Sequence, residues 1–166
     1  SVAKEVASRV APLMEGGVVI VSLGDLQAHG GVAAACAHSM ALSPAPGQTE
    51  MTLLAHAVRA RRMLLVLDDV DTADDLPALL GALQADPLEA RVLLLTSSRI
   101  DQRGVRHVEV QALSSPAQPA DVNQGLRTAS FALFQMRCPV AGPEQATPAW
   151  QADVMALLHR LEGLPL

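Results

Sequence analysis

The residues of this sequence that are best suited to chemistry follow two short apolar runs. Asp68 and Asp69 come directly after the first of them, residues 63–67. Adjacent carboxylates at the end of a buried strand can hold Mg²⁺. One carboxylate orients the ion through its water molecules and the next polarises an attacking water. The same two acids can also do no more than solvate a strand end, and the pair alone leaves both interpretations open.

A second polar group follows the apolar run of residues 92–95. It begins with Thr96 and continues through Ser97 and Ser98 to Arg99. Hydroxyls and a guanidinium at the end of a strand can sense a phosphate, because the planar guanidinium matches two phosphate oxygens at once. The alternative is that Arg99 is an ordinary surface residue after a strand.

Other catalytic and metal-binding motifs are missing from the sequence. It contains no phosphate loop of the form Gly-x-x-x-x-Gly-Lys-[Ser/Thr], no Gly-x-Ser-x-Gly and no His-Glu-x-x-His. The five histidines show no catalytic spacing, and we expect them to be structural or on the surface. Cys36 and Cys138 lie far apart and fit neither a disulfide framework nor a zinc site. We expect Cys36 to be a small buried hydrophobe.

Composition excludes several classes of function. The chain has 166 residues, of which 50% are hydrophobic and 17% charged, so it can bury the core of one domain. A net charge of −5 and an aromatic content of 2% argue against direct nucleic-acid binding. The apolar runs are too short to cross a membrane, and the first residues do not resemble a secretory signal. We therefore expect a cytoplasmic protein with reduced cysteines.

Alternating strand and helix patterns would position these polar residues. Short apolar runs predict buried strands at residues 18–21, 63–67 and 92–95, and the alternating residues 107–110 predict a shorter fourth strand. Helical patterns separate the runs, and Asp71 or Thr72 is expected to cap the helix before the third strand. This alternation predicts an α/β fold with a parallel sheet and helices on both faces. The polar residues that follow the strands would then meet at the edge where ligands bind.

Helical spacing also marks both ends of the sequence. Val2, Val6 and Val10 recur at this spacing and predict the buried face of a helix that ends at Gly16 and Gly17. Towards the other end, residues 131–136 predict a short helix, and Val154, Leu157, Leu158 and Leu161 predict a longer one.

The order of the segments resembles the nucleotide-binding domain of STAND-class P-loop ATPases. The segments are LLVLDDVD, RVLLLTSSR, HVEVQAL, SFALFQMR and finally RLEGLPL. This class includes the NB-ARC domain of plant resistance proteins and animal apoptosis adaptors, and the related ATPase domain of large bacterial transcriptional regulators. The resemblance implies a P-loop NTPase-like fold that binds ATP or ADP with Mg²⁺ in a signal-transducing regulatory switch.

The resemblance also implies roles for individual residues. LLVLDDVD is similar to the Walker B strand, so that Asp68 would orient Mg²⁺ and Asp69 would position the attacking water. TSSR resembles the strand-end sensor motif and would place Arg99 at the γ-phosphate, with Thr96 and Ser98 beside it.

The GLPL motif is the most specific part of the resemblance. Its proline, Pro165, would pack against the adenine. The implied partners are neighbouring winged-helix, sensor and effector domains of a parent chain, with a homo-oligomer formed on activation. Hydrolysis in the intact parent would be slow and would serve to reset the switch.

Departures from the family pattern change what is expected of this chain. The phosphate loop, its lysine and the central strand before them have no counterpart in the sequence. We therefore expect residues 1–166 to be a partial domain that is inactive alone. The phosphate loop would lie upstream of residue 1 and the winged-helix region downstream of residue 166.

Two alternatives remain beside this interpretation. The first is a module of the same fold that binds nucleotide or protein partners without catalysis. The second is a receiver-type phosphoacceptor domain, which also carries an acidic strand end. A receiver needs an acidic pair after its first strand and a lysine after its fifth, whereas this sequence offers only Asp25 and has no lysine beyond Lys4.

Overall fold

The computed structural model describes residues 2–24, 29–84, 91–138 and 147–164. The chain divides into two compact units, Ser1–His107 and Val108–Leu166, and each is described here by itself. Within the described residues, no helix combines the length and the apolar character needed to cross a membrane.

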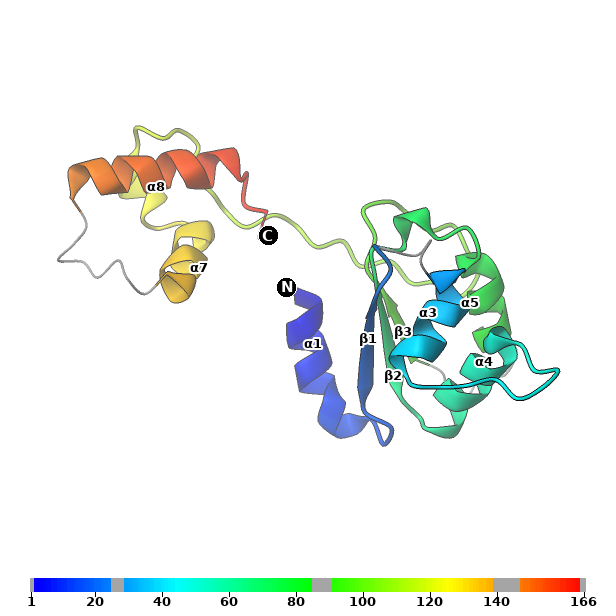
Figure 1. Ribbon diagram of the computed structural model, residues 1–166. Coiled ribbons are helices and arrows are strands. Elements are labelled where there is room, and N and C mark those ends of the chain that lie inside the picture. Colours follow the sequence, from blue (N-terminus) through cyan, green and yellow to red (C-terminus); the bar gives the residue numbers. More distant parts are fainter. Residues whose placement is uncertain (1, 25–28, 85–90, 139–146, 165–166) are drawn as a thin grey trace. The chain divides into compact units, whose positions relative to one another are not determined.

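The first unit is built on a parallel sheet of three strands (Figure 1). The strands are β1 (Val18–Ser22), β2 (Leu64–Asp68) and β3 (Arg91–Leu94), in the order β1-β2-β3. β2 is central and pairs with both neighbours, so that Ile20, Val66 and Leu93 lie side by side. The three apolar runs thus form the expected strands, and the α/β class is confirmed.

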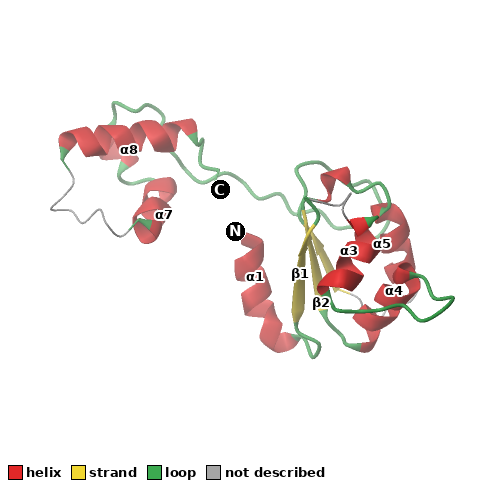
Figure 2. Cartoon of the chain, in the orientation of Figure 1, coloured by secondary structure: helices red, strands yellow, loops and turns green. Residues whose placement is uncertain are grey.

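Helices cover both faces of the sheet (Figure 2). α1 (Val2–Val10) precedes β1 and lies on one face, whereas α3 (Val32–Ser39), α4 (Glu50–Ala60) and α5 (Leu76–Gln84) lie on the other. Local sequence explains where α4 begins, because the Thr49 side chain caps it by accepting a hydrogen bond from the Thr52 N–H. Right-handed crossovers between parallel strands require such intervening helices.

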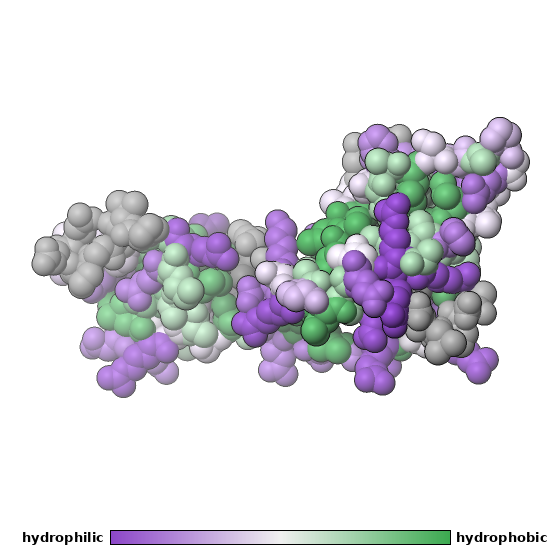
Figure 3. Space-filling view, turned by 90° about the horizontal axis from the view of Figure 1, so that it is seen from below, coloured by the Kyte–Doolittle hydropathy of each residue, from purple (hydrophilic) through white to green (hydrophobic). Residues whose placement is uncertain are grey.

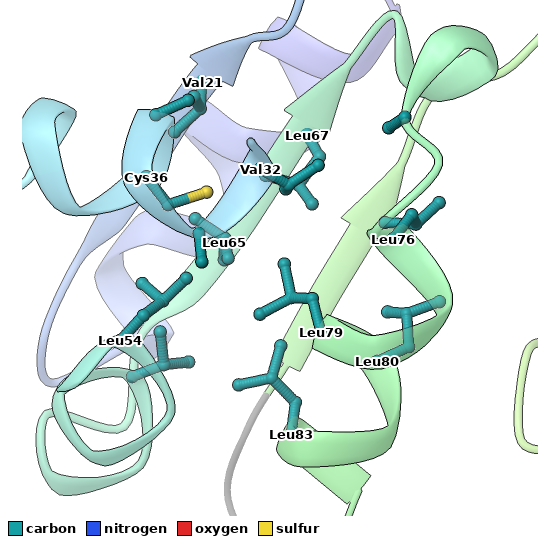
Figure 4. Close-up of a cluster of buried hydrophobic side chains, with 14 of the residues drawn as sticks. Val21, Val32, Cys36, Leu54, Leu65, Leu67, Leu76, Leu79, Leu80 and Leu83 are labelled. Carbon is teal, nitrogen blue, oxygen red and sulfur yellow. The ribbon is translucent and has the colours of Figure 1, made fainter. Parts of the chain in front are cut away.

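The main core lies between the sheet and the three helices α3, α4 and α5 (Figure 4). Leu65 and Leu67 of β2 point into it and are fully buried, as are Leu54 of α4 and Leu79 of α5. Cys36 of α3 lies among them, also fully buried, as expected from the sequence. Burying aliphatic side chains of this size stabilises a fold by about 1.5–3 kcal/mol each.

The opposite face of the sheet has a smaller core under α1. Its buried members are Ala7, Leu64 and Val66. The predicted apolar face of α1 is correct only at its end, because Val10 packs against this core whereas Val2 and Val6 are exposed and the buried residues of the helix are Ala3 and Ala7. Ala7 packs against Leu64 and Val66 of β2, and its small side chain allows close approach between helix and strand. Apolar residues reach the surface among polar ones in the space-filling view (Figure 3).

The predicted fourth strand is not present. Residues 107–110 have no regular secondary structure, and Val108 and Val110 are exposed. An alternating pattern forms a strand only where a neighbour satisfies its backbone N–H and C=O groups. In the described part of the chain, no strand lies beside this segment.

The second unit consists of short helices around a small core. The helices are α6 (Val122–Gly125), α7 (Ala129–Arg137) and α8 (Pro148–Arg160). Thr128 and Thr147 cap α7 and α8 by accepting a backbone N–H each. The core is formed by Phe131, Val154, Met155 and Leu158. Both helices predicted from the sequence in this region are therefore present.

Candidate functional site

Backbone hydrogen bonds hold the carboxyl ends of the three strands together. The Leu23 N–H donates to the Asp68 carbonyl over 2.9 Å, which joins the ends of β1 and β2. The Leu95 N–H donates to the Leu67 carbonyl over 2.9 Å, and the Val70 N–H donates to the Leu95 carbonyl over 3.3 Å. The polar residues that follow β2 and β3 therefore meet at one edge of the sheet, as the sequence predicts.

The acidic pair after β2 occupies two different environments. Asp68 is the last residue of the strand, is half-buried and lies beside Ser22 in the sheet register. Asp69 is exposed and adopts a left-handed backbone conformation with φ 65° and ψ 50°. A Cβ atom on Gly24 would lie 3.4 Å from Asp69 Oδ2, which places this carboxylate next to the end of β1.

Both carboxylates of this pair are free to act on a ligand. Neither Asp68 nor Asp69 makes a side-chain hydrogen bond or ion pair with another residue in the described ranges. Two uncommitted carboxylates, one half-buried and one exposed, suit a hard cation that keeps several of its waters.

A third acid, Asp71, binds the polar loop that follows β3. Its Oδ1 accepts hydrogen bonds from the Thr96 hydroxyl over 2.8 Å, the Ser98 hydroxyl over 2.7 Å and the Ser98 N–H over 3.1 Å. The Ser97 N–H lies 3.0 Å from Oδ2 and 3.2 Å from Oδ1. The Ser97 backbone bond and then the Ser98 and Thr96 hydroxyls hold the pKa of Asp71 well below its usual range.

The sequence assigned Asp71 a different role. We expected Asp71 or Thr72 to cap the helix that follows, but α5 begins at Leu76 and Asp71 belongs to a 3-10 turn, Val70–Thr72. The carboxylate instead caps the loop of residues 96–98. A usable signal was present, since a Ser/Thr-rich strand end supplies donors and an acid after the adjacent parallel strand supplies an acceptor.

The predicted phosphate-sensing residues differ in how far they are committed. The hydroxyls of Thr96 and Ser98 both lie within hydrogen-bond distance of Asp71 Oδ1. Arg99 is exposed and makes no hydrogen bond or ion pair with the part of the chain that the structure describes. Pro165, the predicted adenine contact, lies outside the described residues.

A fourth acid of the same segment, Asp75, caps α3. The Val32 N–H donates to Asp75 Oδ2 over 2.9 Å. Gly31 makes this approach possible, since a Cβ atom there would lie 2.7 Å from the same oxygen. Burial, and secondarily the charge of Asp75, raises the pKa of the Cys36 thiol to about 12. Cys36 is therefore a packing residue and not a nucleophile at neutral pH.

The described residues hold no larger group of metal-binding side chains, at the sheet edge or elsewhere. Among residues 2–24, 29–84, 91–138 and 147–164, no three His, Cys, Asp or Glu side chains are close enough to hold one ion. A hollow of about 280 Å³ lies over α3 and the start of α4, and His29, His38 and Glu50 contribute to its lining. It contains none of the predicted site residues.

Known proteins offer no guide to this site. Comparison of the chain with models of protein families, with curated proteins and with solved structures gave no match. The functional argument therefore depends on the chemistry of the sheet edge.

Proposed function

We propose that this chain is part of an adenine-nucleotide-binding regulatory switch domain with a P-loop NTPase-like fold of the STAND type. The observation that carries the proposal is the arrangement at the carboxyl edge of the sheet. Two uncommitted carboxylates, Asp68 and Asp69, follow the central strand β2, and the Thr96–Arg99 loop follows its neighbour β3. In parallel α/β sheets, ligands bind at this edge.

Each residue has a distinct role in the proposed switch. Asp68 would hold Mg²⁺ through water, because it is half-buried at the end of β2 and its carboxylate is uncommitted. Asp69, which is exposed beside Gly24, would orient the water that attacks the γ-phosphate. Arg99 would contact the γ-phosphate through its guanidinium. Mg²⁺ would neutralise the charge of the phosphate oxygens.

The rest of the nucleotide site would come from outside the described residues. Pro165 would contact the adenine, and a phosphate loop upstream of residue 1 would supply the backbone N–H groups that hold the phosphates. Nucleotide state would then decide how neighbouring winged-helix and effector domains pack, and whether the parent forms oligomers.

The first test is to determine the coding sequence on both sides of this segment. A Gly-x-x-x-x-Gly-Lys-[Ser/Thr] motif immediately before Ser1 would support a nucleotide switch. A gene that begins at this point would leave the phosphates without a cradle and would contradict catalysis. Partners that complete the sheet would then become the subject of study.

The second test is kinetic and uses the intact parent. We expect Asp69→Asn to slow ATP hydrolysis by about tenfold or more while nucleotide binding survives, because only the positioning of water is lost. Asp74→Asn is the matched control, since Asp74 is exposed and lies in the same segment. Equal hydrolysis by Asp69→Asn and wild type would remove Asp69 from the mechanism. Tight ADP binding without hydrolysis in the wild type would favour the non-catalytic module.

A further inference from the structure

A polar contact of several hydrogen bonds at the sheet edge joins two segments far apart in the sequence. Asp71 lies 25 to 27 residues before the groups that it binds. Two hydroxyls and two backbone N–H groups of residues 96–98 converge on its single carboxylate. Beside this contact, the Val70 N–H is bonded to the Leu95 carbonyl. The turn after β2 and the loop after β3 are therefore joined through both backbone and side chain.

These bonds have a consequence for any ligand at the edge. The Ser98 hydroxyl donates to the Asp71 carboxylate, and the one proton of the Thr96 hydroxyl has two acceptors at 2.8 Å, Asp71 Oδ1 and the Ser98 carbonyl, so neither hydroxyl has a proton left for a phosphate oxygen. Arg99, the next residue, is left without a partner among the described residues. Thr96 and Ser98 thus hold the shape of the loop, whereas Arg99 is available to bind an anion.

We propose that Asp71 is a positioning residue that fixes the Thr96–Ser98 loop, so that Arg99, and not the loop hydroxyls, meets the γ-phosphate of a bound nucleotide. The part of this inference that concerns phosphate rests on the proposed function. The part that concerns the loop rests on the hydrogen bonds alone.

An ionised aspartate suits this role better than the neutral side chain of the same shape. A carboxylate offers two oxygens that only accept hydrogen bonds, which matches donors arriving at both. In asparagine, an NH₂ group would replace one of these oxygens and would face a hydrogen-bond donor of the loop. Because Asp71 and the loop are exposed, water competes for every bond, and the loop keeps its shape only through several charge-assisted bonds acting together.

The loop itself is tested on the 166-residue chain without any nucleotide. NMR measures the exchange rate of the Ser97 and Ser98 amide hydrogens in wild type, Asp71→Ala, Asp71→Asn and Asp74→Asn. We expect exchange to be about tenfold faster in Asp71→Ala and to increase less in Asp71→Asn. The control Asp74→Asn should match wild type. Unchanged exchange in both Asp71 variants would overturn the proposal, and Asp71→Asn keeps the test decisive if Asp71→Ala does not fold.

The link to phosphate is tested on the intact parent by comparing ATP with ADP. We expect Asp71→Ala to weaken ATP binding about five- to tenfold and to leave ADP binding unchanged, because only the γ-phosphate meets Arg99. Arg99→Ala should have the same effect, and the double variant should lose no more than either single one.

Each other outcome of this comparison has a defined meaning. Tighter ATP binding by Asp71→Ala would show that Asp71 is an anion that phosphate displaces, and would overturn the proposal. Equal losses of ATP and ADP affinity would assign Asp71 a general structural role and would also overturn the proposal. If wild type binds neither nucleotide, the proposed function fails together with the phosphate part of this inference. The amide exchange still decides whether Asp71 holds the loop.

Discussion

The two faces of the sheet are covered to different extents. On the face under α3, α4 and α5, Val21 of the flanking strand β1 is 3% exposed. On the face under α1, its neighbour Ile20 is 45% exposed. On the central strand β2, Leu67 and Val66 point to opposite faces and both are fully buried. The difference between the faces is therefore seen on β1, while Val92, Leu93 and Leu94 of β3 are half-buried on both faces.

Dimensions explain this difference. A helix with its side chains is about 10 Å wide, and neighbouring strands lie about 4.8 Å apart, so one helix covers about two strands. α1 alone cannot cover a three-stranded sheet, whereas three helices can. The face under α1 is thus buried at its centre, at Val66, and open at its margin, at Ile20.

The largest expected effect comes from removing a leucine of the covered face. Leu67→Ala should lower the free energy of unfolding by about 3–4 kcal/mol, because a closely packed site cannot collapse into the space left behind. Ile20→Ala on the other face should cost about 1 kcal/mol, since nearly half of that side chain is already in water. Val21→Ala, on the same strand as Ile20 but on the covered face, should cost about 2 kcal/mol. Urea unfolding of the three variants gives the values, and a loss for Val21→Ala no larger than that for Ile20→Ala would contradict the difference between the faces.

A structural element could be predicted from the sequence where it depends on neighbouring residues, and could not where it depends on residues far away in the sequence. The strands at 18–21, 63–67 and 92–95 were predictable, because runs of buried β-branched and leucine residues need no distant partner to be recognised. The segment 107–110 was not, since its alternating pattern forms a strand only beside another strand. Which residues of α1 pack against the sheet depends on how closely the helix approaches it. The spacing of the valines alone does not determine this.

The candidate site shows the same limit. Asp68, Asp69, Thr96 and Ser98 could be placed at one edge of the sheet, because parallel strands bring their carboxyl ends together. The role of Asp71 was missed, since its donors lie 25 to 27 residues away and the signal, a Ser/Thr-rich strand end opposite an acid, becomes decisive only once the register of β2 and β3 is known. A local rule assigned it to a helix cap instead.

The next effect is a loss of stability in alkali that originates on the covered face. Burial raises the pKa of Cys36 from 9.0 to about 12, so the folded chain retains a proton that the unfolded chain loses. Stability from this thiol is complete below pH 9 and declines as the pH rises towards 12. At about 1.4 kcal/mol per pH unit, the loss should reach about 2–3 kcal/mol at pH 11.

Few other groups obscure this measurement. The sequence contains no tyrosine, and Lys4 is its single lysine. Urea unfolding at pH 8 to 11 should show the decline in wild type and in Cys138→Ala, whose cysteine is exposed, but not in Cys36→Ala. A decline that persists in Cys36→Ala would have another origin.

A smaller effect is expected at the junction between α3 and the segment after β2. Gly31 has φ 135° and ψ 169°, a conformation open almost only to glycine, and a Cβ atom there would meet Asp75. Gly31→Ala should therefore destabilise the protein by about 2 kcal/mol. Gly81→Ala is the matched control, because a Cβ atom at this position in α5 meets nothing, and should stabilise by about 0.5–1 kcal/mol. Thermal unfolding would reveal the opposite signs, and a neutral Gly31→Ala would mean that Asp75 does not hold α3.

The smallest effect should come from the exposed side of α1, and it decides how this helix lies. Val6 is 39% exposed and Ala7 only 4%. Val6→Ala should change the free energy of unfolding by less than about 0.5 kcal/mol, because the better helix propensity of alanine offsets the lost apolar contact. Val58→Ala in α4, at a fully buried valine, should cost about 2–3 kcal/mol in the same urea experiment. A loss above about 1.5 kcal/mol for Val6→Ala would instead mean that Val6 packs against the sheet. The two faces of the sheet would then be covered to more similar extents.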